Sequence, residues 1–390
     1  MTSLSETSVN PSGPQSPGPS AQDLRAPFPY FGGKRRVASL VWQALGDVRN
    51  YVEPFVGSAA VLLSRPTEPR IETINDRDCM IANFWRAITW DPVAVAEWTD
   101  WPVNEADLHA RHKWLVERRQ KVRELLEDPT AFDPMVAGWW VWGISQWIGG
   151  GWCAEHPWGP EHRRPHISGN SHGHGVHRKR PVAGADNPGR GVHQMPRAYA
   201  EGGQGVHGAQ LTRKRPHLSG AGGGVGVHST NKRHLGALVE WFEALAARLR
   251  SVRVICGDWR RVTGDSVILG SKKATFTSGI FLDPPYRTSE RANGLYAVDQ
   301  DVAVDVRDWA LEKGNNERLR IVVAGYEGLM DGTTWRDDGW REIRWSTSGG
   351  YGNQKKAGRG RSNASRERLF LSPYCLNDGQ LDMWADQQAT

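Results

Sequence analysis

The sequence predicts an α/β protein with a mixed, mostly parallel sheet and helices on both faces. Short apolar runs alternate with amphipathic segments of helical length, the order expected when helices join parallel strands. Two of the runs end in turn residues, since 51–53 leads into Pro54 and 280–282 leads into Asp283. Because the carboxyl ends of parallel strands share one edge of the sheet, both turns are expected at a common ligand-binding edge.

The remaining elements follow from the same patterns. Strands are predicted at 71–74, 252–255 and 319–324, which are short and rich in β-branched residues. A charged helix is predicted over 105–127 and a weaker one over 301–313. Apolar residues recur at helical spacing in 234–250, so this helix should pack on the sheet.

The closing part of the sheet and its strand order can also be predicted. Ile343 and residues 369–371 are expected to form an antiparallel edge. The topological switch is expected between the strands that end at Glu53 and at Asp283. Two turns that are far apart in the sequence should therefore lie side by side.

The tetrapeptide Asp283-Pro284-Pro285-Tyr286 suits methylation of an exocyclic amine on a base. The lone pair of such an amine is delocalised into the ring, so its hydrogens must be oriented by acceptors. Asp283 and the carbonyl oxygen of Pro284 can each accept one hydrogen, in a frame that the prolines make rigid. Tyr286 offers a face on which the base can stack. A plain polar turn is the alternative, because Asp and Pro are common turn residues.

Residues 51–63 predict a strand, a turn of small residues and a helix. Gly57 and Ser58 would let a ligand approach the backbone closely, and Asp76 follows the next strand at a position suited to ribose hydroxyls. The chain has no GK[ST] motif or phosphate-binding glycine run, which favours a nucleotide without a phosphate chain. A tight strand-to-helix connection without a ligand is the alternative.

Four motifs in this order resemble the Dam-type DNA adenine-N(6) methyltransferases: PFPYFGGK (27–34), YVEPFVGSAAVLL (51–63), INDRD (74–78) and DPPY (283–286). The resemblance covers about residues 26–90 and 250–372. It implies a Rossmann-like catalytic domain, S-adenosylmethionine as the cofactor, and methyl transfer to adenine in double-stranded DNA. One departure is Ala59, which stands where the family's turn usually has a second glycine.

The resemblance also implies roles for single residues. The catalytic residues are Asp283, Pro284 and Tyr286, and no metal is expected. The cofactor-binding residues are Tyr30, Lys34, Glu53, Phe55, Gly57, Asp76, Asp258 and Asp283. Within this set, Phe55 and Gly57 line the methionine side, Asp76 holds the ribose, and Asp258 lies beside the adenine. Tyr30 and Lys34 contact the cofactor or the reacting base.

Composition divides the chain into segments. The expected boundaries are a disordered Ser/Pro-rich tail (1–25), a first catalytic part (26–100), a helical Trp-rich target-recognition region (101–158), a flexible basic insert (159–234), a second catalytic part (235–374) and a tail (375–390). In the recognition region, most tryptophans are expected in the helix-packing core. Trp147 and Trp152 are flanked by glycines, so they are expected at a loop and in contact with bases.

The insert is rich in glycine and histidine and holds 12 Lys or Arg but only 3 Asp or Glu. It is predicted to lie along DNA and contact phosphates through two basic runs, Arg178-Lys179-Arg180 and Arg213-Lys214-Arg215. A solvated segment without a specific role is the alternative. Metal binding by its histidines is disfavoured, because carboxylate and cysteine partners are sparse.

Whole-chain properties agree with a DNA-binding enzyme. The net charge is +6, and no apolar run approaches the length of a membrane span. The four cysteines are far apart in the sequence, which favours a reducing cytosol. The family resemblance implies that this is the cytosol of a bacterium or of a phage-infected cell. We expect a monomer without an obligate protein partner, of the kind found in restriction-modification systems.

Two other functions remain open from the sequence. Methylation of the cytosine exocyclic amine uses the same geometry, and base analysis of modified DNA would separate the two. A DNA-binding relative with weak or lost turnover is the second, with Ala59 as the one departure from the motifs.

Overall fold

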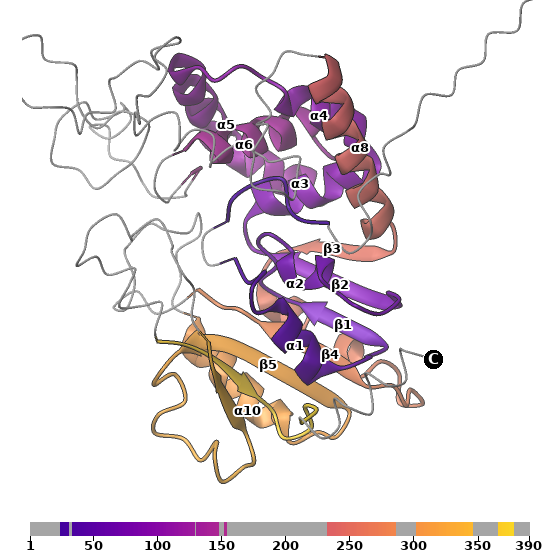
Figure 1. The fold of residues 1–390 in the computed structure, drawn as a ribbon, viewed down its shortest axis with the longest axis vertical. Helices are drawn as coiled ribbons and strands as arrows, with labels where there is room; N and C mark the ends of the chain where they lie inside the picture. Colours follow the sequence, from indigo (N-terminus) through magenta and orange to yellow (C-terminus); the bar gives the residue numbers. More distant parts are fainter. Residues whose placement is uncertain are drawn as a thin grey trace, which may run out of the picture.

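A seven-stranded sheet forms the centre of the protein (Figure 1). The computed structural model describes residues 24–30, 33–128, 130–147, 152–153, 232–285, 302–345 and 366–377. Within them the strand order is β3-β2-β1-β4-β5-β7-β6. The strands are β1 (Asn50–Glu53), β2 (Ile71–Asp76), β3 (Val252–Cys256), β4 (Ser278–Leu282), β5 (Leu319–Tyr326), β6 (Arg341–Arg344) and β7 (Glu367–Leu371).

The sheet is parallel except at one edge. Strands β3, β2, β1, β4 and β5 all run in the same direction, whereas β7 is antiparallel to both β5 and β6. Strand β1 pairs with β2 on one side and with β4 on the other, so the switch point lies where it was predicted. Asp283 consequently emerges next to the turn that follows Glu53. The predicted mixed, mostly parallel sheet and its antiparallel edge are confirmed.

Helices cover both faces of the sheet. Those described are α1 (Ala38–Leu45), α2 (Ala60–Leu63), α3 (Cys79–Trp90), α4 (Pro92–Thr99), α5 (Glu105–Leu125), α6 (Pro134–Gln146), α8 (Lys232–Leu249), α9 (Asp265–Ile268) and α10 (Ala303–Gly314), with a 3-10 turn η3 (Trp259–Arg261). Alternate residues of β4 belong to two cores: Phe281 lies in the hydrophobic cluster that also contains residues of α1, whereas Ile280 and Leu282 lie in the cluster that contains residues of α10. This alternation follows from the two-residue period of a strand.

A helical layer lies beyond the β3 edge of the sheet (Figure 1). Helices α4 and α6 pack on each other, α6 packs on α3, and α4 packs on α8. Side-chain carboxylates of Asp78, Asp91 and Asp133 cap α3, α4 and α6, which satisfies backbone N–H groups at the start of each helix. In the described ranges, no helix has the length and apolarity needed to cross a membrane.

Trp147 and Trp152 lie inside this helical layer. Each is only 5% exposed, and the His112 ring of α5 stacks on Trp147 with 4.7 Å between centroids. The Trp152 indole N–H donates to the Trp140 carbonyl at 3.1 Å, and the ring occupies the space that a Cβ on Gly143 would fill. Both lie outside the helices, as their flanking glycines indicated, since Trp147 follows α6 and Trp152 lies in a turn. Their burial was not expected, and their contact with bases stays a prediction. Glycine at position 143 makes room for an indole, so the tryptophans belong to the packing core.

Candidate active site

The turn after β1 is held tightly around Gly57. This residue has φ of +45°, and a Cβ on it would lie 2.4 Å from the Tyr30 ring. Glycine is therefore required both for the backbone conformation and for the close approach of Tyr30. The Gly57 N–H donates to Asp76 Oδ2 at 3.0 Å, and the Trp85 indole N–H donates to the Gly57 carbonyl at 2.9 Å. The turn thus has one defined shape, with Tyr30 against it.

Ala59 adopts the left-handed backbone conformation that its position requires, with φ of +51°, and is fully buried. A non-glycine residue pays about 1–2 kcal/mol for this conformation. Glycine would remove that strain, but it would also lose the buried methyl group and would cost about 0.5–1 kcal/mol of backbone entropy. These opposing contributions nearly cancel, which explains how alanine is tolerated in the turn.

We therefore expect Ala59→Gly to leave the free energy of unfolding within about 1 kcal/mol of the wild-type value. The control is Ala60→Gly, one residue further along and inside α2, where glycine should cost about 1 kcal/mol. Urea denaturation of both variants tests this comparison. A larger loss of stability in Ala59→Gly than in Ala60→Gly would contradict our account of the turn.

Asn75 joins the carboxyl ends of three strands. Its side-chain Nδ2 donates to the Pro54 carbonyl after β1 at 2.9 Å and to the Gly257 carbonyl after β3 at 3.0 Å. Its own backbone carbonyl accepts the Val56 N–H at 2.9 Å. Asn75 is buried, and the sequence analysis missed it. Its place inside INDRD was the available signal, but the residue type alone does not reveal which backbone groups it binds.

Asp76 lies at the end of β2, beside the glycine turn. One carboxylate oxygen accepts the Gly57 N–H and the other accepts the Asp78 N–H at 2.9 Å. Burial raises the pKa of Asp76 to about 7, and the nearby negative charge of Asp78 adds to this effect. Each oxygen keeps further lone-pair capacity, so the carboxylate can still accept hydrogen bonds from a ligand.

Asp78 connects this region to the helical layer. Its Oδ1 accepts the Met80 N–H and forms a buried ion pair with the Arg119 guanidinium of α5 at 2.5 Å. Arg119 also donates to the Cys153 carbonyl at 2.5 Å. The end of β2 and helix α5 are therefore held in a fixed relation.

Glu53 is buried at the end of β1, and its carboxylate supports the turn. Its Oε2 accepts the Tyr51 hydroxyl at 2.9 Å and the Leu62 N–H at 3.2 Å. Burial raises the pKa of Glu53 from 4.5 to about 8, although both hydrogen bonds oppose this shift. The folded protein thus binds this proton more tightly than the unfolded chain does.

This raised pKa predicts how stability depends on pH. The contribution of Glu53 to stability should be fully present below pH 4.5 and should be lost as the pH rises through about 8. Each unit of pKa difference corresponds to about 1.4 kcal/mol, so Glu53→Gln should gain roughly 2–4 kcal/mol over the wild type at pH 8 and little at pH 5. Urea denaturation at both pH values tests this, with exposed Glu117→Gln as the control. An equal effect of Glu53→Gln at the two pH values would contradict the expectation.

Asp283 and Lys34 form an ion pair at the carboxyl edge of the sheet. The distance from Lys34 Nζ to Asp283 Oδ1 is 2.9 Å, and the Lys34 side chain is 4% exposed whereas that of Asp283 is 21% exposed. Burial raises the pKa of Asp283, and the adjacent ammonium group opposes the shift. Lys34 also lies 5.9 Å from the centre of the Trp345 ring. Asp283 is therefore anchored by a buried cation while it remains accessible to a substrate.

The predicted adenine side lies at the end of β3. Asp258 accepts the Arg260 N–H at 3.0 Å and thereby begins η3, while its side chain remains 41% exposed. The ring of the following residue, Trp259, is buried with its centroid 6.3 Å from that of Phe55. These two rings form an apolar contact between the ends of β1 and β3.

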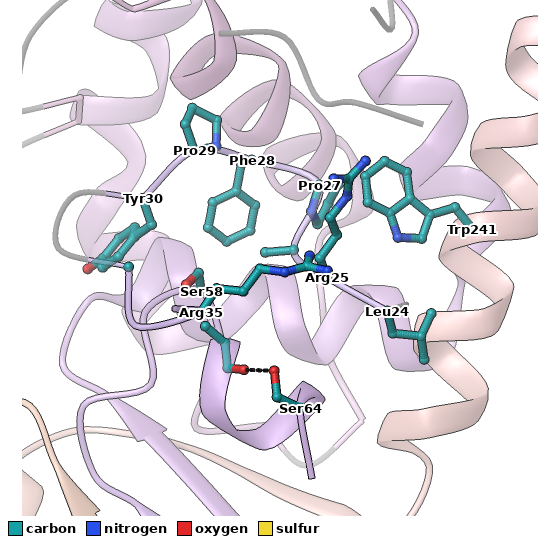
Figure 2. Close-up of a pocket in the computed structure, with 13 residues that line it drawn as sticks. Leu24, Arg25, Pro27, Phe28, Pro29, Tyr30, Arg35, Ser58, Ser64 and Trp241 are labelled. Atoms are coloured by element: carbon teal, nitrogen blue, oxygen red, sulfur yellow. Dashed lines mark hydrogen bonds between the residues drawn. The ribbon is translucent and has the colours of Figure 1, made fainter. Parts of the chain in front are cut away.

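A cavity of about 290 Å³ adjoins the glycine turn (Figure 2). It is lined by the segment 24–30, by Ser58 and Ser64 on either side of α2, and by Trp241 of α8. Figure 2 shows the side chains of Arg25 and Arg35 extending into this space. Open space therefore exists on the helical side of the turn, beside Tyr30.

The structure brings together most of the predicted site. Tyr30, Lys34, Glu53, Phe55, Gly57, Asp76, Asp258 and Asp283 all lie at or beside the carboxyl ends of β1, β2, β3 and β4. Tyr286 and the six basic residues at 178–180 and 213–215 lie outside the described residues. Two features could hold a nucleoside cofactor: a carboxylate with spare acceptors at Asp76 and an apolar contact at Phe55. Gly57 contributes the shape of the turn between them, with Tyr30 packed against it.

Comparison with known families agrees with this geometry. Residues 30–122 match a family described as D12 class N6 adenine-specific DNA methyltransferase. The matched segment contains Tyr30, Lys34, the glycine turn, Asp76 and most of α5. No curated protein matches the chain.

Proposed function

We propose a mechanism for the reaction of this chain. Its residues 30–122 place it in the D12 class of N6 adenine-specific DNA methyltransferases. The class methylates adenine in DNA, and methyltransferases of this kind use S-adenosylmethionine. The observation that carries the proposal is the position of Asp283, which follows β4 beside the glycine turn and pairs with buried Lys34 at 2.9 Å. Acceptor and cofactor turn meet at the switch point of the sheet.

The cofactor would be held by the turn and by the ends of β2 and β3. Its methionine part would lie along the Gly57 turn beside Phe55, Asp76 would accept hydrogen bonds from the ribose, and Asp258 would lie beside the adenine. Tyr30 and Glu53 support this shape, since the first packs on Gly57 and the second accepts the Leu62 N–H. When bound, S-adenosylmethionine supplies a methyl group activated by its sulfonium.

Asp283 and Pro284 would orient the target amine. The adenine leaves the duplex at a cost of a few kcal/mol, and Tyr286 stacks on it. Asp283 and the Pro284 carbonyl oxygen each accept one amine hydrogen, which directs the nitrogen lone pair toward the cofactor. Lys34 favours the ionised form of Asp283, which is the better acceptor. Positioning of this kind is the main source of the rate enhancement that we infer.

The helical layer is our proposed target-recognition region. Its helix α5 is tied to the cofactor side through the Asp78–Arg119 ion pair, so DNA bound there would have a fixed relation to the site. The basic insert at 159–234 would add contacts to phosphates. We further propose a monomer that acts on double-stranded DNA in the cytosol.

Sequencing that detects methylated bases tests this proposal in cells. DNA from cells that lack adenine methylation and express the wild-type protein should carry N6-methyladenine in one short sequence context. Cells that express Asp283→Asn should lack it. Methylation at that context in both strains, or in neither, would overturn the proposed role of Asp283.

A further inference from the structure

Glu367 lies at the same edge of the sheet as Asp283. It is the first residue of β7 and pairs with Tyr326 at the carboxyl end of β5. The strand order places β5 between β7 and β4, whose end leads into Asp283. On its other side Glu367 neighbours Trp345, whose backbone N–H donates to the Glu367 carbonyl at 3.4 Å. Trp345 is the residue whose ring faces Lys34 at 5.9 Å.

The Glu367 side chain is a buried acid that lacks a hydrogen-bonded partner on one oxygen. The residue is 9% exposed, and Oε2 has no hydrogen-bond partner among the residues that the structure describes. The adjacent Arg368 does not serve this role, because its side chain pairs with Glu342 at 2.7 Å and with Glu327 at 2.9 Å. A buried acceptor without a partner is unfavourable, so a group of this kind at the edge of a site suggests a functional role.

The charges around Glu367 indicate what this role could be. Burial raises the pKa of Glu367, the positive charge of Lys34 lowers it, and the negative charge of Asp283 raises it. Lys34 therefore favours the ionised form of both carboxylates: it forms an ion pair with Asp283, and its charge lowers the pKa of Glu367 without direct contact. Glu53 is a third carboxyl near Asp283, but burial raises its pKa to about 8, which favours its uncharged form at neutral pH. Taken by themselves, the three described side chains Lys34, Asp283 and Glu367 comprise one cation and two acids, which is an excess of negative charge.

We propose that Glu367 is a positioning residue for methyl transfer: it acts through Lys34 and supplies the negative charge that balances the sulfonium of the cofactor. Among these described groups, Lys34 and the sulfonium would supply two positive charges opposite the two negative charges of Asp283 and Glu367. Asp283 can then turn to the target amine while Lys34 keeps a counter-charge. This inference rests on the proposed function, because it requires a sulfonium cofactor at this edge.

Binding of a charged and an uncharged ligand tests the inference. S-adenosylmethionine carries the sulfonium, whereas S-adenosylhomocysteine is a neutral thioether of nearly the same shape. Loss of one charge several ångströms away, at an effective dielectric constant of about 20, should weaken S-adenosylmethionine binding to Glu367→Gln about tenfold and leave S-adenosylhomocysteine within about twofold. Calorimetric titration gives both affinities. Glu327→Gln, on an exposed acid that pairs with Arg368, is the matched control and should change neither.

Two further variants separate charge from packing. Glu367→Asp keeps the negative charge, so it should bind S-adenosylmethionine in preference to S-adenosylhomocysteine nearly as strongly as the wild-type protein does. This variant can be measured even if Glu367→Gln fails to fold. Glu367→Gln should lower the single-turnover rate of the wild-type protein but not that of Lys34→Met, because the effects of residues that act through one another are not additive. The inference would be overturned if Glu367→Gln weakened the binding of both ligands equally. It would also be overturned if the effects of Lys34→Met and Glu367→Gln on the single-turnover rate were additive. Failure of the wild-type protein to bind either ligand would instead overturn the proposed function.

Discussion

Replacing Asp283 with asparagine is expected to lower the single-turnover rate of methyl transfer by about 10²- to 10⁴-fold. Asparagine keeps one acceptor oxygen, but its NH₂ group would face a hydrogen of the target amine, and Lys34 would lose a counter-charge 2.9 Å away. Transfer of a radiolabelled methyl group to duplex DNA measures the rate. The matched control is Asp265→Asn, an exposed aspartate paired with Lys313, which should retain wild-type activity.

The same substitution should also affect stability, and a double variant separates the two effects. Leaving the buried Lys34 without Asp283 should destabilise the fold by up to about 3–5 kcal/mol. Lys34→Met combined with Asp283→Asn removes both charges, so it should recover stability without recovering activity. Near wild-type turnover of Asp283→Asn would contradict the catalytic role. Recovery of turnover in the double variant would show that only stability had been lost.

Gly57→Ala is expected to weaken S-adenosylmethionine binding by about 10- to 100-fold, because an alanine here costs about 1–2 kcal/mol in backbone strain and also displaces its neighbour. The new Cβ would lie 2.4 Å from the Tyr30 ring, so either the turn or Tyr30 must move. Both form part of the proposed cofactor site. Calorimetric titration with S-adenosylmethionine measures the loss.

Gly236→Ala is the control for this prediction. Gly236 lies in α8, and no described atom lies within 4 Å of a Cβ placed there. Alanine should stabilise this helix by about 1 kcal/mol and leave cofactor binding unchanged. Wild-type affinity in Gly57→Ala would mean that the turn does not hold the cofactor.

The sheet could be predicted from the sequence because each strand carries its own signal. The run 280–282 is apolar and ends at Asp-Pro-Pro, which cannot continue a ladder, so both the strand and its end were visible. The glycine turn after Glu53 gave the same signal for β1. Adjacency of the two strands then followed from the switch-point rule for parallel sheets. Strand β4 does pair with β1 and with β5.

Pairings between distant side chains could not be predicted in this way. Lys34 was expected at the cofactor or the base, but the sequence does not show that it pairs with Asp283. Asn75 joins three strand ends through hydrogen bonds to backbone carbonyls, which no residue pattern encodes. The flanking glycines indicated that Trp147 and Trp152 lie outside the helices, but their burial depends on α5 and α6 packing together, which the glycines do not encode.

The most direct test of the central claim is nucleoside analysis by mass spectrometry of duplex DNA treated with the purified protein and S-adenosylmethionine. We predict N6-methyldeoxyadenosine with the wild-type protein and only trace amounts with Asp283→Asn. Formation of N4-methyldeoxycytidine in its place would contradict the assignment of adenine as the target. The absence of any methylated nucleoside, with cofactor and DNA both bound, would contradict the assignment of Asp283 to a working methyltransferase site.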